Sequence, residues 1–416
     1  MTTKITSLCE IWEQYINKPV KPSIQHTRES VQNEASQQMI NTDNSFNDMY
    51  KNSIFKKLWN QSIIHFGDHE VLADDSPIQK DMFAHLDDYP DAEMNTVIFN
   101  NGLMSKLSAS RGSYRTYAIW SGRESGTVAD QAYKSLVGYS AQTMPGTLAT
   151  RLTDTTEVLN ITDNCRLTLT SDPSVSNDAT LKENAHWSIK DADESILNTG
   201  VYIVRICRGA RVHINELHTG HNKFFCNKWI YIVDYGASLT LDRRAEMTDG
   251  VIDSTHIIQY PNSDLTINTY DTGNQWRNIN ITAYQSTTTN VNGSTMLKNS
   301  DSANFIDVHH KGYDGNSNIK YNSAIYNSNT GNFIGEVRVE KKAVGTKSEM
   351  TNKNLLVDPL SRAFSKPVLH INTKEIECTH GCTTSKISED EIYYLESLGV
   401  DSSTAKTIIA NGHIQI

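Results

Sequence analysis

The sequence predicts a mainly β fold, and three observations in residues 155–345 predict it. Short runs alternate apolar and polar residues, at Val212/Ile214, Leu239/Leu241, Leu265/Ile267 and Ile279/Ile281. A period of two gives each strand one inward and one outward face. Turn-forming Gly and Asn residues separate the runs, and Pro261 is the one proline between Pro173 and Pro359. Scarce proline is what continuous β-ladders require, so the strands are expected to form extended sheets.

Two architectures fit this pattern. One is an antiparallel sandwich, and the other is a β-helix in which every coil adds one rung to parallel sheets. The frequent Asn and Thr residues near the strand ends favour the β-helix, whose stacked rungs can pair like side chains. The runs have no strict repeat length, so the residues alone leave both architectures open.

The N-terminal region has a different texture, with mixed helix and loop expected over residues 1–92. Apolar residues recur at steps of three and four in residues 50–66, which predicts an amphipathic helix packed on a core. Residues 71–92 are rich in Asp and Pro and are expected to form a linker. Residues 97–102 predict a strand that enters a turn.

The C-terminal region predicts a helical hairpin. Ser388 and Glu391 form a capping box at the start of the first helix. Gly399 follows that helix, where a left-handed cap is favoured. A second helix is expected over residues 402–410, ending at Asn411-Gly412.

Composition and charge exclude several classes of function. The 416 residues carry 38 Lys and Arg against 48 Asp and Glu, a net charge of -10, which disfavours nucleic acid as a partner. No apolar stretch approaches the length of a membrane span. Six cysteines are few for this length, and no secretory signal precedes them, so a reducing, cytoplasmic location without disulfides is expected.

Common catalytic motifs are missing from the sequence. There is no Gly-x-x-x-x-Gly-Lys-Ser/Thr loop, so nucleotide binding in that mode is not expected. Neither Gly-x-Ser-x-Gly nor His-Glu-x-x-His occurs. Asp242 or Glu246 could serve acid–base chemistry as in polysaccharide-active β-helices, which keeps a carbohydrate-binding or carbohydrate-active protein as an alternative. The chain is otherwise expected not to be an enzyme.

The one cluster of soft ligands is the segment Cys378-Thr379-His380-Gly381-Cys382. On a strand, Cys378, His380 and Cys382 would face the same side. Thiolate and imidazole suit zinc, copper or iron–sulfur species, but a fourth ligand and Cys-x-x-Cys spacing are missing. The alternative is a pair of small buried cysteines beside a structural histidine.

The remaining histidines are weaker candidates. His309 and His310 are adjacent, so at most one of them can point inward from a strand. His213 and His218 lie near Glu216 at irregular spacing and are expected to be solvated or hydrogen-bonded.

Residues 333–412 resemble the SufB/SufD family of the SUF iron–sulfur cluster assembly system. The resemblance rests on an ordered series of segments: Phe333-Ile334-Gly335-Glu336-Val337-Arg338-Val339, Thr351-Asn352-Lys353-Asn354-Leu355-Leu356-Val357, Lys366-Pro367-Val368-Leu369-His370-Ile371, Cys378-Thr379-His380-Gly381 and Ile392-Tyr393-Tyr394-Leu395-Glu396-Ser397-Leu398-Gly399. The Cys-x-His-Gly motif and Asn352 are similar to the corresponding residues of SufD-type chains. Residues 383–387 instead resemble the corresponding segment of SufB-type chains. The likeness is diffuse through the middle of the chain and absent before about residue 90.

The resemblance implies a right-handed parallel β-helix core over residues 93–380, between an N-terminal region 1–92 and a C-terminal helical region 381–416. It implies a SufD-like scaffold subunit that works with a SufB-like subunit and the SufC ATPase, with a homodimer as the alternative assembly. It also implies a transient iron–sulfur cluster at the subunit interface, with His380 as ligand and Cys378 close by.

Three departures from the family pattern bear on these expectations. Cys382 stands where a small residue is usual, which adds a candidate ligand. Leu398 stands where an Arg is usual, and the sequence ends at Ile416, where relatives continue with helix, so altered SufC docking is expected. A purely structural subunit without a ligand role is the remaining alternative.

Overall fold

The computed structural model describes residues 4–5, 64–66, 95–100, 103–108, 114–120, 149, 156–161, 164–170, 195–219, 223–246 and 250–415. The helix expected over residues 50–66 is wrong at its end, because Ile64–Phe66 forms strand β2 and pairs in parallel with β8 (Ser195–Ile206). Sheet pairing outweighs helical periodicity in that short segment. The rest of that prediction lies outside the described residues.

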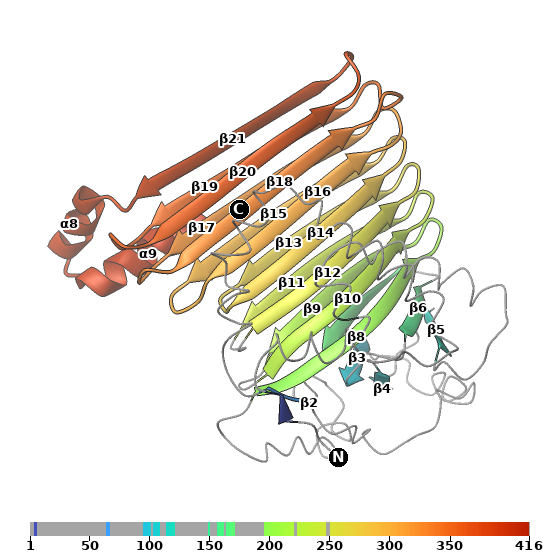
Figure 1. The fold of residues 1–416 in the computed structure, drawn as a ribbon, viewed down its shortest axis with the longest axis horizontal. Helices are drawn as coiled ribbons and strands as arrows, with labels where there is room; N and C mark the ends of the chain where they lie inside the picture. The colour runs from blue at the N-terminus through green and yellow to red at the C-terminus, as the bar shows by residue number, and fades with distance from the viewer. Residues whose placement is uncertain are drawn as a thin grey trace.

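The described strands form two large sheets that together make a parallel β-solenoid of about seven turns (Figure 1). The first sheet contains β1 (Lys4–Ile5), β2, β5 (Tyr114–Trp120), β6 (Thr156–Ile161), β8, β10 (Lys223–Val233), β12 (Gly250–Gln259), β14 (Gln275–Ala283), β16 (Ser302–His310), β18 (Thr330–Val339) and β20 (Arg362–Ile371). The second contains β3 (Asn95–Asn100), β4 (Leu103–Ser108), β7 (Cys165–Thr170), β9 (Arg211–Thr219), β11 (Ser238–Glu246), β13 (Asp264–Asp271), β15 (Thr288–Leu297), β17 (Asn316–Ile325), β19 (Lys347–Leu356) and β21 (Glu377–Lys386).

From β7 onward, consecutive strands alternate between the two sheets, and each strand pairs in parallel with the equivalent strand of the next coil. This connectivity confirms the β-helix and excludes the antiparallel sandwich. The coils differ in length: Ile281 pairs with Ile257, 24 residues earlier, whereas Leu369 pairs with Val337, 32 residues earlier. The unequal turns explain why the sequence shows no strict repeat.

Inward-facing side chains stack in rows along the solenoid. One row of the second sheet is aliphatic through six coils and fully buried: Ile214, Leu241, Ile267, Val291, Ile319 and Met350. Burying each such side chain contributes about 1.5–3 kcal/mol, so this row is a main support of the coil stack. In the next coil the row continues to His380, where the apolar character ends.

Two helices follow the solenoid, as predicted. Helix α8 (Glu389–Ser397) begins at Ser388, whose side chain accepts a hydrogen bond from the Glu391 amide, and Gly399 adopts a φ of 87° after it. Helix α9 (Ser402–Ile414) does not stop at residue 410 as expected but runs through Asn411-Gly412. No described helix is long and apolar enough to span a membrane.

The extension of α9 has a tertiary cause. Ser294 Oγ donates to the Ile414 carbonyl at 2.7 Å, and Asn322 Nδ2 donates to the His413 carbonyl at 3.0 Å. These bonds from β15 and β17 satisfy carbonyls that the helix end leaves open. Docking on the sheet therefore outweighs the local helix-breaking preference of Asn411-Gly412.

The last coil leaves two long sheet edges. Among the described residues, β20 pairs with β18 alone and β21 pairs with β19 alone. Figure 1 shows both strands at one end of the stack, with α8 and α9 beyond the strand ends. A ten-residue edge presents unpaired backbone donors and acceptors that favour pairing with another strand.

Candidate functional site

The three predicted soft ligands lie on the terminal strand β21. Their register places Cys378 beside Ser348, His380 beside Met350 and Cys382 beside Asn352 of β19. Because residues two apart on a strand face the same side, all three side chains follow the inward face of the last coil. The prediction that these three residues share one face required them to lie on a strand, and the structure places them on one.

The two cysteines differ in their surroundings. Cys378 is half-buried and packs against the main core together with Leu369 and Ile376. Burial raises the pKa of the Cys378 thiol, and a backbone hydrogen bond from Ser348 opposes that effect in part. His380 and Cys382 are exposed.

A buried amide lies under the Cys382 sulfur. Asn352 is fully buried, and its Nδ2 donates to the Tyr321 carbonyl at 3.0 Å, which turns Oδ1 toward the open end. That oxygen accepts from Asn354 Nδ2 at 2.8 Å, from Ser365 Oγ, and from Cys382 Sγ at 3.7 Å. Asn352 therefore holds the thiol in a defined direction.

The ligand set is incomplete within the described part of the chain. In the register, the inward positions of the neighbouring edge strand β20 are Ala363, Ser365, Pro367, Leu369 and Ile371. These residues offer one hydroxyl and no thiolate, imidazole or carboxylate. A tetrahedral metal ion or a cluster would need further ligands from outside this coil.

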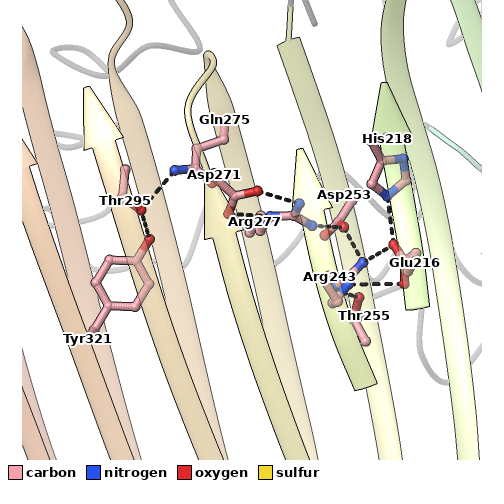
Figure 2. Close-up of polar contacts among 10 residues, drawn as sticks. All are labelled: Glu216, His218, Arg243, Asp253, Thr255, Asp271, Gln275, Arg277, Thr295 and Tyr321. Atoms are coloured by element: carbon pink, nitrogen blue, oxygen red, sulfur yellow. Dashed lines mark hydrogen bonds and ion pairs between the residues drawn. The ribbon is translucent and has the colours of Figure 1, made fainter. Parts of the chain in front are cut away.

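A second polar cluster lies inside the solenoid, and the sequence did not reveal it (Figure 2). Arg243 donates to Glu216 Oε1 at 2.6 Å and also to Asp253, and Arg277 donates to Asp253 Oδ2 at 2.6 Å. Arg277 also forms two bonds with Asp271, at 2.7 and 3.0 Å. We call these five residues together with His218 the buried ion network.

Nearly complete burial shapes the electrostatics of the buried ion network. His218 Nε2 lies 2.6 Å from Glu216 Oε1, which bears out the hydrogen-bonded role expected for this histidine. Burial alone would raise the pKa of Glu216, but Arg243 and His218 hold that pKa well below its ordinary value. The Glu216 carboxylate is therefore charged and depends on its partners.

Glu216, His218 and Asp253 also bring potential metal-ligand atoms within 4.8 Å of one another. The guanidinium of Arg243 already contacts both carboxylates at this point. A fixed positive charge in contact with the ligands opposes binding of a second cation. The arrangement is that of a structural ion network.

The remaining sequence candidates have ordinary partners. His310 is fully buried while His309 Nε2 contacts Glu340 Oε1 at 3.0 Å, so only one of this pair points inward, as expected. Asp242 accepts from Asn268 at 2.7 Å and lies 2.6 Å from His213, beside a surface hollow of about 830 Å³. This engaged carboxylate does not favour the carbohydrate-active alternative, and the Glu246 side chain lies outside the described residues.

The fold and its terminal strand define a β-solenoid with three candidate soft ligands at an open end. The family model for the SUF system FeS cluster assembly SufBD core domain matches residues 189–413, which is more than half of the sequence. The chain therefore belongs to the SufBD family of iron–sulfur cluster assembly proteins.

Individual relatives align over shorter segments. The Escherichia coli (strain K12) iron–sulfur cluster assembly protein SufD is 33% identical over 101 residues, 24% of this chain and 24% of that protein. A SufBD family protein of Synechocystis is 34% identical over 77 residues, 18% of this chain and 17% of that protein. A Mycobacterium tuberculosis (strain H37Rv) family member is 31% identical over 99 residues, 24% of this chain and 12% of that protein. The matched segments thus span a quarter or less of these relatives.

Proposed function

We propose that this chain is a SufD-like, non-catalytic scaffold subunit that supports iron–sulfur cluster assembly together with a SufB-like subunit and a SufC-like ATPase. The observation that carries the proposal is the position of His380 on the terminal strand of the solenoid, whose outer edge has no partner strand among the described residues. A ligand there can act together with ligands from a second chain that pairs with the same edge.

The proposed partner of the open end is a SufB-like subunit. The outer edges of β20 and β21 each run for ten residues, and alternate residues offer backbone hydrogen bonds along them, except that Pro367 of β20 has no N–H to donate. Strand addition to such an edge is a common recognition mode. A second copy of this chain is the alternative occupant, and it would present its own Cys378-x-His380-x-Cys382 segment.

The proposed cluster is transient and lies at this interface. His380 is its ligand from this chain, and a sulfur comes from Cys378 or from Cys382. The incomplete ligand set supports this role, because a site shared by two subunits loses ligands when the subunits move apart. Cys207, Cys226, Cys378 and Cys382 are free thiols, which suits a reducing compartment such as the cytoplasm.

The proposed ATPase surface is the C-terminal helical pair. Helix α8 has no buried residue, and it exposes Tyr393 at 74%, Tyr394 at 63% and the adjacent Leu398 at 63%. Neighbouring exposed large apolar residues mark protein interaction sites. ATP would be bound by the partner and not by this chain.

Co-purification with both partners tests the assembly. The full chain, co-expressed with a SufB-like and a SufC-like protein, is expected to recover both. Tyr394→Glu should lose the ATPase while it keeps the SufB-like subunit, because α8 lies beyond the strand ends and contributes no backbone to the sheet edge. Tyr313→Glu, at another exposed tyrosine, is the control and should keep both partners. Recovery of neither partner by the wild-type chain would contradict the proposal.

A further inference from the structure

The spacing along β21 limits which of the three soft ligands can share one ion. A parallel strand rises about 3.3 Å per residue, so the Cα atoms of Cys378 and Cys382 lie about 13 Å apart. With a metal–sulfur bond of about 2.3 Å, two cysteines can bind one ion only when their Cα atoms are within roughly 10 Å. Cys378 and Cys382 therefore cannot bind the same ion while β21 is a regular strand.

His380 lies two residues from each cysteine, about 6.6 Å in Cα spacing, so it can pair with either one. The imidazole and a sulfur on the same strand face can then converge on one ion. The choice between the two sulfurs depends on their accessibility and direction.

The environment of Cys378 makes it a packing residue. Its side chain packs against the apolar core, as those of Leu369 and Ile376 do, and it lies beside the buried Ser348. Metal binding at this sulfur would have to draw the side chain out of its apolar contacts. A small, half-buried cysteine in this setting behaves as an apolar side chain.

The environment of Cys382 leaves its sulfur accessible. The residue is exposed, and its thiol donates a hydrogen bond to Asn352 Oδ1 at 3.7 Å. Asn352 is itself fixed by Tyr321, Asn354 and Ser365, so this contact sets the direction of the side chain in the metal-free chain. The contact is given up when the thiol loses its proton to bind a metal, and no apolar contact has to be broken.

We propose that Cys382 and His380 form the sulfur–imidazole pair that binds iron at the open end, and that Cys378 is structural. The pair takes thiophilic first-row cations, including iron of a cluster, and leaves the remaining coordination positions to a partner chain. This assignment rests on the proposed function for its biological cargo, but the pair itself is a property of this chain.

Alkylation of the purified full chain tests the geometry without any cluster chemistry. Under anaerobic conditions, iodoacetamide should modify Cys382 at least tenfold faster than Cys378, as counted by peptide mass spectrometry. In urea the two rates should become similar, which serves as the internal control. Equal rates in the folded chain, or faster modification of Cys378, would overturn the assignment.

Cobalt(II) tests the ligands directly. The wild-type chain should develop a thiolate-to-cobalt charge-transfer band, which Cys382→Ser and His380→Ala should remove and Cys378→Ser should keep. Loss of the band in Cys378→Ser with retention in Cys382→Ser would overturn the proposal. Absence of the band in the wild-type chain would overturn it as well.

Iron content of the complex separates this inference from the proposed function. If cobalt binds as expected but Cys382→Ser leaves the iron of the co-purified complex unchanged, the pair stands and its role in cluster assembly fails. If Cys382→Ser lowers both the cobalt band of the isolated chain and the iron content of the complex, the inference and the proposed function are supported together.

Discussion

Removal of Arg277 should destabilise the solenoid strongly. Its side chain is almost fully buried and forms two hydrogen bonds with Asp271 and one with Asp253. In Arg277→Met, the Asp271 carboxylate loses both of these hydrogen bonds while it remains fully buried. The Asp253 carboxylate keeps its hydrogen bond from Arg243. Removing one partner of a buried ion pair costs about 3–5 kcal/mol. We expect the free energy of unfolding to fall by that amount.

Urea unfolding at pH 7, followed by circular dichroism, measures the loss as a lower midpoint at an unchanged slope. The double variant Arg277→Met/Asp271→Leu should recover much of the loss, because it removes the uncompensated carboxylate. The matched control is Arg338→Met, whose 46% exposed side chain contacts Asp307 and Glu336. That exposed arginine should contribute less than about 1 kcal/mol. A loss below about 1 kcal/mol for Arg277→Met, or a double variant no more stable than the single, would refute this reasoning.

Three further predictions concern pH, packing and the docked helix. Burial lowers the pKa of His310 to about 4 from the usual 6.5, so this neutral histidine stabilises the fold above pH 6.5 and the contribution is lost as pH falls toward 4. Between pH 7 and pH 5, His310→Gln should therefore lose about 2 kcal/mol less stability than the wild-type chain in parallel urea titrations; equal losses would contradict it. Burial raises the pKa of Asp307 to about 6, so protonation of this carboxyl adds stability as the pH falls. That effect is the same in the wild-type chain and in His310→Gln, and it cancels in the comparison. A Cβ at Gly293 would lie 2.1 Å from the Tyr321 ring, so Gly293→Ala should cost about 1–3 kcal/mol, and Gly293→Ala/Tyr321→Val should recover part of it. Ser294→Ala/Asn322→Ala removes two bonds to the end of α9 and should speed proteolytic cleavage within residues 402–414, with Asn318→Ala as the control on the same outward face of β17; unchanged cleavage would show that the helix is held by apolar contacts instead.

The periodicity of the sequence predicts the strands well, because burial in a solenoid alternates with the chain. The alternation at Leu239/Leu241 and Leu265/Ile267 corresponds to fully buried inward positions of β11 and β13. Periodicity alone could not show whether the strands pair in parallel or antiparallel. That choice depends on which strands become neighbours, and the pairing comes from contacts 24 or more residues apart.

The buried ion network shows where sequence reasoning falls short. Arg243 and Asp271 occupy inward positions of β11 and β13, but an arginine or aspartate in a strand is normally read as an outward residue. One signal in the sequence could have indicated a buried charge. Arg243 lies two residues after the inward-facing Leu241, and so its side chain faces the same side of the strand. The end of α9 was missed for a related reason, because bonds from Ser294 and Asn322 are invisible in the local sequence.

The candidate ligands were found from the sequence because soft ligands at alternating positions are distinctive. Their ranking could not be found in that way. Cys378 and Cys382 are equivalent by spacing around His380, and only the core contacts of one and the Asn352 contact of the other distinguish them.

The iron and sulfide content of the complex with a SufB-like and a SufC-like partner, purified anaerobically, tests the cluster role of the open end most directly. His380→Ala is compared with His370→Ala, a control at another exposed histidine of the last coil. We expect the complex to form in both cases, and iron and sulfide to fall at least severalfold in His380→Ala alone. An intact complex with unchanged iron and sulfide in His380→Ala would contradict a cluster role for the open end and would leave this chain a purely structural subunit.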